Sequence, residues 1–236
     1  MNAHPAFTCG PSRSWMVNPG LRIETWAPGS RRPIVSRSDD AHNPMGMRYE
    51  AKHKARTRER IVRNAGRKLR GKGLSGAGVA EVMKASGLTV GGFYKHFGSK
   101  DELVADAITH GFAEFNAMLA TLGDVPRKDR WKEIVRLYLS PEHRDHPESG
   151  CPVAALAPEM SREKLRVRKH VTGLLQERRD ILLDLMPGRN AEERERNFFV
   201  IFSAMAGAIS IARIFTDPAD RDRVLESTRE FLLRSF

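Results

Sequence analysis

Apolar residues recur along this chain with the spacing of a helix, and no segment shows the alternation of a half-buried strand. No proline occurs between residues 45 and 125, so helices can form there wherever glycine permits. Beyond that region, prolines divide the chain into five stretches of helical length, at 127–140, 152–160, 161–186, 191–216 and 219–235. The pattern predicts an all-α protein.

The first helix of the proline-free region is predicted over residues 53–71. Ile61, Ala65 and Leu69 stand four residues apart and form an apolar stripe, whereas many of the residues between them are basic. Glycines at positions 71 and 73 are expected to end this helix.

Two short helices that meet across a tight turn are predicted next. The earlier one covers about 78–85, and Gly87 supplies the left-handed residue that stops it. Thr89 is a natural N-cap for the later one, which is expected to turn Val90, Phe93 and Phe97 inward.

A fourth helix is expected to begin at Ser99 and to run to about Leu122. Ser99 and Glu102 have the spacing of a capping box, in which each side chain accepts a hydrogen bond from a backbone N–H at the helix start. Lys100 lies in the first turn, where a cation opposes the helix dipole. Its presence is explained if a phosphate binds beside the exposed N–H groups of this helix.

The positive charge is concentrated in one part of the chain. Residues 47–112 carry +8 of the formal net charge of +11, whereas residues 113–236 are close to neutral. Ten basic residues lie within twenty-one positions: Lys52, Lys54, Arg56, Arg58, Arg60, Arg63, Arg67, Lys68, Arg70 and Lys72. A basic module beside a balanced domain is typical of a protein that binds a polyanion, although a basic run can also be an ordinary solvated helix face.

Several short motifs follow one another in the basic region. They are Arg60-Ile61, Gly73-Leu74, Ala85-Ser86-Gly87-Leu88-Thr89, Gly91-Gly92-Phe93-Tyr94-Lys95-His96-Phe97 and Gly98-Ser99-Lys100-Asp101-Glu102-Leu103. With these motifs, residues 54–103 resemble the N-terminal domain of the TetR family of transcriptional regulators. The resemblance implies a three-helix DNA-binding domain with a helix-turn-helix, followed by a helical domain for effector binding and dimerisation.

The resemblance also implies a function. The implied protein is a ligand-responsive regulator, and a repressor is the first expectation. It binds a palindromic operator in double-stranded DNA as a homodimer. A small-molecule effector releases it from the DNA. One departure concerns the start of the second helix, where the family has Thr-Thr or Thr-Val and this chain has Ala77-Gly78. Either Ser75 replaces the missing hydroxyl, or the helix begins without a side-chain cap.

The outward side of the third helix carries the candidate DNA contacts. A phenol and an ammonium can reach phosphate or base edges, and the Thr89 side chain can contact phosphate or a thymine methyl group. For His96, phosphate contact and local packing both remain open. The candidate DNA-binding set is Arg56, Ser75, Thr89, Val90, Gly91, Gly92, Tyr94, Lys95, His96 and Lys100.

The glycine pair in the third helix is unfavourable for helix formation. Relative to two alanines, Gly91 and Gly92 cost a free helix about 2 kcal/mol. We infer that the absent Cβ atoms permit a close approach to the DNA backbone or to the first helix. The alternative is that the pair has no role and the helix is held by its two phenylalanines.

The neutral second half contains a ridge of small residues. Ser203, Ala204, Gly207, Ala208 and Ile211 share one helix face, which permits close packing against another helix. We predict a two-fold symmetric dimer through about 194–215 and 219–236, with packing inside one chain as the alternative.

A small-molecule pocket is expected in the same half of the chain. Its candidate lining residues are aromatic or sulfur-containing: Trp131, Tyr138, Cys151, Met160, Phe198, Phe199 and Phe202. Such residues at helical spacing are also typical of an ordinary core, and the identity of the effector does not follow from them.

Cys151 is expected at a helix N-terminus, since Pro152 suits the first helical position. A thiolate is stabilised there, which makes a redox or electrophile sensor an alternative to a structural cysteine. A competing function is a thiol-dependent enzyme with a basic appendage, with His143 or His146 as base. The spacing of these histidines favours a solvated loop over a zinc site, and no metal or cofactor is expected.

The domain organisation is predicted as a flexible leader at 1–46, a DNA-binding domain at 47–112 and the helical domain at 113–236. The leader is rich in proline, and Met47 is an alternative start. The most apolar run, 198–212, is interrupted by serines and closed by an arginine, so we expect no membrane span. Two cysteines and no apparent secretory signal favour the cytoplasm.

Overall fold

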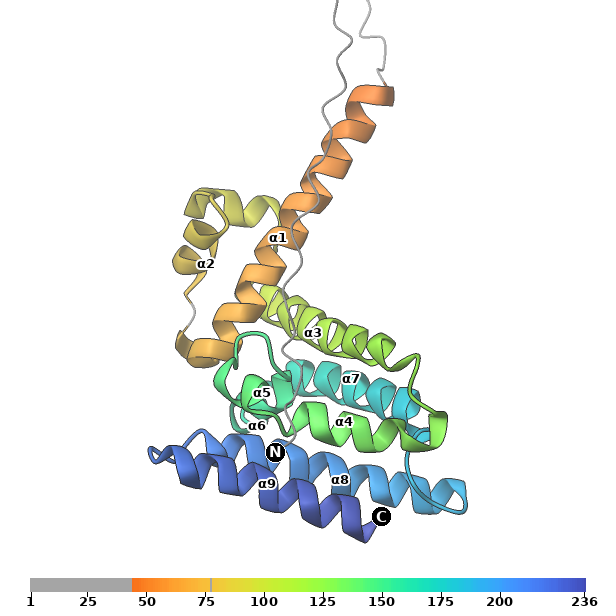
Figure 1. The fold of residues 1–236 in the computed structure, drawn as a ribbon. Helices are drawn as coiled ribbons and strands as arrows, with labels where there is room; N and C mark the ends of the chain where they lie inside the picture. Colours follow the sequence, from red (N-terminus) through yellow and green to blue (C-terminus); the bar gives the residue numbers. More distant parts are fainter. Residues whose placement is uncertain (1–43, 77) are drawn as a thin grey trace, which may run out of the picture. The chain divides into compact units, whose positions relative to one another are not determined.

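The computed structural model describes residues 44–76 and 78–236, and every regular element in these ranges is a helix (Figure 1). The α-helices are α1 (Pro44–Gly76), α2 (Val79–Ala85), α3 (Lys100–Leu119), α4 (Arg130–Tyr138), α5 (Pro141–Asp145), α6 (Pro152–Met160), α7 (Leu165–Leu183), α8 (Ala191–Ala212) and α9 (Pro218–Ser235). Three 3₁₀ helices complete them: η1 (Val90–Lys95), η2 (Ala120–Leu122) and η3 (Arg127–Asp129). The predicted all-α fold class is confirmed.

The predicted helices are present, with three differences, the first of which is that α1 begins at Pro44 and not at residue 53. The third helix is the 3₁₀ helix η1, in which the N–H of Gly92 bonds to the carbonyl of Thr89 at 3.1 Å. The segment around His143, predicted as a solvated loop, contains the short helix α5, with Ser140 as N-cap and Pro141 at the first position. Helix α5 was missed because five residues are too few to establish a period.

A first hydrophobic core joins α1, α3 and the short helices around Gly87. Ile61, Ala65 and Leu69 are buried on the predicted apolar face of α1. The same core includes Leu156 and Met160 of α6 and two valines of α7, which belong to the predicted second domain. The predicted division after residue 112 therefore does not separate two independent cores.

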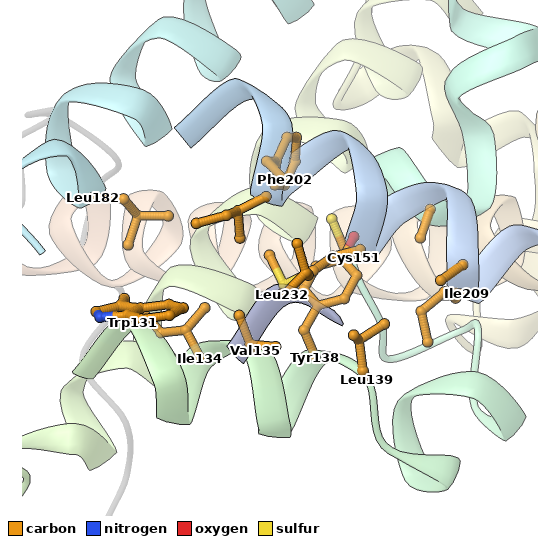
Figure 2. Close-up of a cluster of buried hydrophobic side chains, with 14 of the residues drawn as sticks. Trp131, Ile134, Val135, Tyr138, Leu139, Cys151, Leu182, Phe202, Ile209 and Leu232 are labelled. Carbon is orange, nitrogen blue, oxygen red and sulfur yellow. The ribbon is translucent and has the colours of Figure 1, made fainter. Parts of the chain in front are cut away.

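A second core is built from α4, α8 and α9 with the end of α7 (Figure 2). Helix α8 has the length and hydropathy to cross a membrane by composition alone, a test that the core helix of a soluble protein also passes. Its buried residues, among them Ile201, Met205 and Ile209, lie in this core.

Helix α6 contributes to both cores. Near its beginning, Cys151 and Ala154 belong to the second core, whereas Leu156 and Met160 belong to the first. The Glu159 side chain extends this contact, because its Oε2 accepts a hydrogen bond of 2.6 Å from the backbone N–H of Leu74.

That hydrogen bond lies at a kink in α1. Gly73 has a φ of 81° and a ψ of 167°, which interrupts the helix where the glycine pair predicted its end. A Cβ atom at Gly73 would lie 2.7 Å from Glu159 Oε1. Both the backbone conformation and the close approach of the carboxylate therefore require glycine at this position.

The predicted leader lies outside the described residues except for positions 44–46, which are part of α1. The alternative start at Met47 is not tested by the fold.

Replacing Gly73 with alanine should lower the free energy of unfolding by about 2 kcal/mol, because a strained left-handed residue and a displaced hydrogen bond both destabilise the folded state. The matched control is Gly173→Ala, in the middle of α7, where a methyl group meets nothing within 4 Å. The control should raise stability by about 0.5–1 kcal/mol. Urea denaturation measures both, and equal midpoints for the two variants would contradict this account.

Candidate nucleic-acid interface

The turn between α2 and η1 is fixed by local geometry and by α1. Gly87 has a φ of 68°, so the left-handed residue predicted there is confirmed. The side-chain amide of Asn64 on α1 donates to the Ala85 carbonyl at 3.1 Å and to Ser86 Oγ at 3.0 Å. These bonds attach the turn to α1.

Behind η1, two aromatic side chains anchor it in the first core. Phe93 and Phe97 are each 2% exposed, and their rings stack with centroids 5.5 Å apart. The guanidinium of Arg58 lies 4.5 Å from the centre of the Phe97 ring, and it bonds to Glu102 at 2.6 Å and to Asp106. One arginine thus connects α1, the anchor of η1 and α3.

The outward side of η1 is exposed as predicted for Tyr94, which is 78% exposed, and for Thr89, Gly91 and Lys95. Val90 was predicted to point inward, and this is wrong, since it is 51% exposed. Because η1 has only two turns, its core contacts come from its second turn and from the phenylalanine that follows it. Val90 is therefore a surface residue, in keeping with its place in the candidate set.

The hydroxyl groups expected to cap these helices do not do so. Thr89 has the extended backbone of an N-cap, but its side chain makes no capping hydrogen bond. Gly78 is the N-cap of α2, also without a side-chain cap, and Ser75 is exposed at the end of α1. Ser75 therefore does not replace the missing hydroxyl as a cap, and α2 begins without a side-chain cap.

The start of α3 has the predicted capping box, except that Glu102 accepts its hydrogen bond from the residue before Ser99 and not from Ser99 itself. Ser99 Oγ accepts the N–H of Glu102 at 3.1 Å, and Glu102 Oε2 accepts the N–H of Gly98 at 2.8 Å. The Gly98 N–H lowers the pKa of Glu102, and Arg58 adds to the effect. Lys100 is exposed at the first position of this helix, beside its N–H groups.

Part of the basic run has a structural role. Lys68 and Lys72 bond to Glu81 of α2 at 2.8 and 2.6 Å, and these bonds lower the pKa of Glu81 to about 2. Arg58 and Arg70 are paired with carboxylates of α3. Within the described part of the chain, the basic side chains of the run that form no ion pair are all exposed: Lys52, Lys54, Arg56, Arg60, Arg63 and Arg67.

His96 is half-buried at the end of η1, with its Nδ1 buried and without a hydrogen-bond partner in the described residues. Burial lowers the pKa of His96, and the nearby charges of Lys54, Arg58 and Lys95 lower it further. These surroundings therefore favour the neutral imidazole over the charged one. The proximity of Lys54 was not predicted, because it depends on how α1 passes η1.

The glycine pair leaves open space at the surface. A Cβ atom at Gly91 would meet nothing within 4 Å, and one at Gly92 would make an ordinary contact of 3.7 Å with Met83. Close approach to the first helix is thus not the reason for either glycine. Approach of DNA, or the absence of any role, remains as the explanation.

The predicted pocket residues do not gather around one cavity. A cavity of about 400 Å³ lies between α7 and α8, and Phe198, Phe199 and Phe202 line it together with Val153 and Leu175. Its polar lining residues are Thr172, Gln176, Arg179 and Ser203. The cavity thus combines three predicted aromatic residues with a largely apolar wall.

The other predicted pocket residues lie elsewhere. Trp131 borders a second hollow of about 660 Å³, whose lining combines charged residues such as Arg127 and Asp184 with apolar ones. Tyr138 and Cys151 are buried in the second core, and Met160 is buried in the first (Figure 2). None of these three lines either cavity.

Cys151 is the N-cap of α6, as predicted, and its side chain is fully buried. His143 lies next to it, but the imidazole Nε2 accepts the backbone N–H of Cys151 at 2.9 Å, and Nδ1 lies 2.7 Å from the Tyr138 carbonyl. Burial lowers the pKa of His143 to about 4. Both ring nitrogens are therefore occupied by backbone groups, which does not fit a base for the thiol.

This geometry defines a class of protein. Two short helices meet across a glycine, and the later one has a buried aromatic side and an exposed side that begins at its N-terminus. That arrangement is a helix-turn-helix, which places its second helix in the major groove of DNA. The chain is a helix-turn-helix DNA-binding protein.

Comparison with known proteins identifies the family. Residues 61–107 match the model of the bacterial regulatory proteins of the tetR family. This matched region, 47 of the 236 residues, is therefore a DNA-binding domain of the tetR family. No curated protein matches it in sequence.

Solved structures share the fold. A TetR transcriptional regulator from Chloroflexus aurantiacus is similar with a TM-score of 0.64 and 24% identity, over 78% of this chain and 95% of that one. NemR of E. coli in its reduced form has a TM-score of 0.63 and 20% identity, over 75% and 95%. FadR of Bacillus subtilis in complex with stearoyl-CoA has a TM-score of 0.58 and 15% identity, over 75% and 98%.

Substitution of Gly91 by alanine should raise the stability of the protein slightly, by up to about 1 kcal/mol, because the added methyl group meets open space at a helical position. If DNA approaches this surface closely, affinity for the operator should fall by about tenfold, equal to about 1.4 kcal/mol. Fluorescence anisotropy with operator DNA measures the affinity, and Gly173→Ala is the control. Unchanged operator affinity would mean that Gly91 has no role in DNA approach.

Proposed function

We propose that the protein is a dimeric repressor that binds a palindromic operator and leaves it when a small-molecule effector binds. The observation that carries the proposal is the exposed face of η1, where Tyr94 and Lys95 lie a few residues before the exposed Lys100 at the start of α3. Phosphate contacts by such cations position a helix-turn-helix, and side chains of the second helix read the bases. The protein would act in the cytoplasm.

An exposed apolar face supports the dimer. On α8, Ile211 is 50% exposed and Phe199 is half exposed, and a Cβ atom at Gly207 would meet open space. On α9, Phe231 is 65% exposed. Apolar residues of this size on adjacent helices favour burial against a second copy. With two-fold symmetry, the recognition helices would lie about 34 Å apart in successive major grooves, which requires a palindromic site.

The dimer is tested by Ile211→Asp, which places a charge at the centre of the predicted interface. We expect the equilibrium to shift to monomers, measured by sedimentation velocity, and operator affinity to fall because half-sites are bound singly. Leu165→Asp, at an exposed apolar residue of α7 outside the predicted interface, is the control and should remain dimeric. A dimeric Ile211→Asp variant would contradict the proposed interface.

The cavity between α7 and α8 supports effector binding, because its volume is within the range of about 300–1,000 Å³ of small-molecule pockets. The structural relative FadR was solved in complex with stearoyl-CoA, so a fold of this kind accommodates a small-molecule ligand. An effector can only shift the protein between two states by its difference in affinity for them.

Helix α6 supports a route from the cavity to the DNA-binding helices. Val153 lines the cavity, and Glu159 bonds to the N–H of Leu74 just before α2. Movement of α6 would therefore change the support of the helix-turn-helix. In this proposal the effector favours a dimer with another helix separation, and affinity for DNA falls.

DNA recognition is tested by footprinting on DNA that flanks the coding region of the protein, repeated at rising salt concentration. Lys95→Ala should reduce affinity and relax the preferred sequence if this side chain reads a base. Lys100→Ala should weaken binding to all sequences alike and reduce the salt slope by about one unit.

The control for both variants is Lys128→Ala, which removes an exposed cation of η3 outside the helix-turn-helix. It should leave both the footprint and the salt slope unchanged. If wild-type protein protects no site and binds no duplex at low salt, the proposed function is wrong. If Lys95→Ala weakens binding to every sequence by the same factor, Lys95 contacts phosphate and does not read a base.

A further inference from the structure

Arg178 on α7 is the largest side chain that is fully buried in the described part of the chain, with 1% of its surface exposed. Its guanidinium lies over two phenylalanine rings of α3, 4.5 Å from the centre of Phe115 and 5.1 Å from that of Phe112. The one hydrogen bond in the described residues runs from Nη2 to the Phe112 carbonyl at 3.4 Å, longer than usual. Its Nε has no partner there.

Other buried arginines of this protein are paired. Arg70 is 5% exposed and bonds to Glu114 at 2.8 Å, and Arg144 is 7% exposed and bonds to Asp145 at 2.9 Å. Arg178 forms no ion pair within residues 44–76 and 78–236. Burial accordingly lowers its pKa. An unpaired buried guanidinium is costly, and an anion bound beside it would offset that cost.

A second unsatisfied polar group lies in the same region of the core. The Tyr138 hydroxyl is buried and has no hydrogen-bond partner in the described residues, and its oxygen lies beside the Cys151 thiol (Figure 2). Burial raises the pKa of Tyr138 well above its usual value, with the neighbouring Cys151 adding to the effect, so the phenol stays protonated as a donor. The Phe115 ring contacts both groups, 5.5 Å from the Tyr138 ring and 4.5 Å from the Arg178 guanidinium.

The cavity between α7 and α8 borders this group of residues. Phe202 lines the cavity, and its ring centre lies 6.4 Å from that of Tyr138. The remaining inner wall is apolar, with Val153 and Phe198. An elongated ligand in the cavity would therefore have an apolar environment along its body and the two unsatisfied donors at one end, behind Phe202.

We propose that Arg178 and the Tyr138 hydroxyl bind the carboxylate of an apolar organic acid, and that this acid is the effector. The assignment rests on the proposed function, because it names the chemical class of the ligand that releases the protein from DNA. The planar guanidinium offers two parallel N–H groups to a carboxylate, and the phenol offers a third donor. One unpaired guanidinium behind an apolar wall fits a monoanion with a hydrocarbon body, and Phe202 turns aside to admit it.

The test is isothermal titration of the full-length protein with straight-chain carboxylates from butyrate to dodecanoate and with benzoate. The neutral probes are 1-octanol and octanamide. We expect at least one carboxylate to bind, and the alcohol and amide of equal length to bind about 10- to 100-fold more weakly, as expected for the loss of a charged hydrogen bond. The bound carboxylate should also reduce operator affinity.

The decisive variant is Arg178→Met, which keeps an unbranched side chain and removes the charged group. It should weaken carboxylate binding by about 10- to 100-fold and leave octanol binding unchanged. Its melting temperature without ligand should equal or exceed that of wild type, because the unpaired charge is removed, whereas a structural role of Arg178 would lower it. Arg168→Met is the control, since Arg168 is an exposed arginine of the same helix that does not line the cavity, and this variant should bind the acids as wild type does.

Tyr138→Phe provides a second measurement, independent of how Arg178→Met folds. It should weaken carboxylate binding by about three- to tenfold, because one hydrogen bond is lost. The inference is overturned if no carboxylate of the series binds to wild type, or if both variants bind the acids within twofold of wild type. The footprint of wild-type protein separates this failure from failure of the proposed function. If the protein still protects its operator, only the effector assignment is wrong.

Discussion

The burial of Phe93 and Phe97 behind η1 holds the DNA-binding surface in place. A six-residue 3₁₀ helix with two glycines has little stability by itself, since the glycines cost about 2 kcal/mol relative to alanines. Each fully buried aromatic side chain contributes about 1.5–3 kcal/mol, so the pair offsets this cost. Arg58 adds a further constraint, because it lies on the Phe97 ring while it is bonded to α3.

The same first core is completed from the other half of the chain. Leu156 and Met160 of α6 are buried in the same core as Phe93 and Phe97, and Glu159 bonds to the backbone just after the Gly73 kink. The DNA-binding helices therefore depend on the position of α6, which also reaches the cavity. Sensing and DNA binding can influence each other through this shared packing, without a separate signalling element.

The local features of the helix-turn-helix could be predicted from the sequence. Gly87 has the left-handed conformation expected after α2, Ser99 and Glu102 cap α3, and Ile61 begins the buried stripe of α1. Each depends on residues within a few positions of one another. Val90 and His143 were predicted wrongly, because their surroundings come from segments distant in the sequence and leave no periodic signal.

The sequence by itself determined the helical fold class, the order of the helices and the place of the DNA-binding turn, because capping, glycine conformation and apolar period act over one or two helical turns. Only the tertiary structure decided which basic residues are used in ion pairs and which remain exposed. It also decided that Arg178 is buried without a carboxylate partner among the described residues and that α6 belongs to both cores. These properties arise from contacts between distant segments, and a charge or an apolar side chain looks the same in the sequence whichever partner it meets.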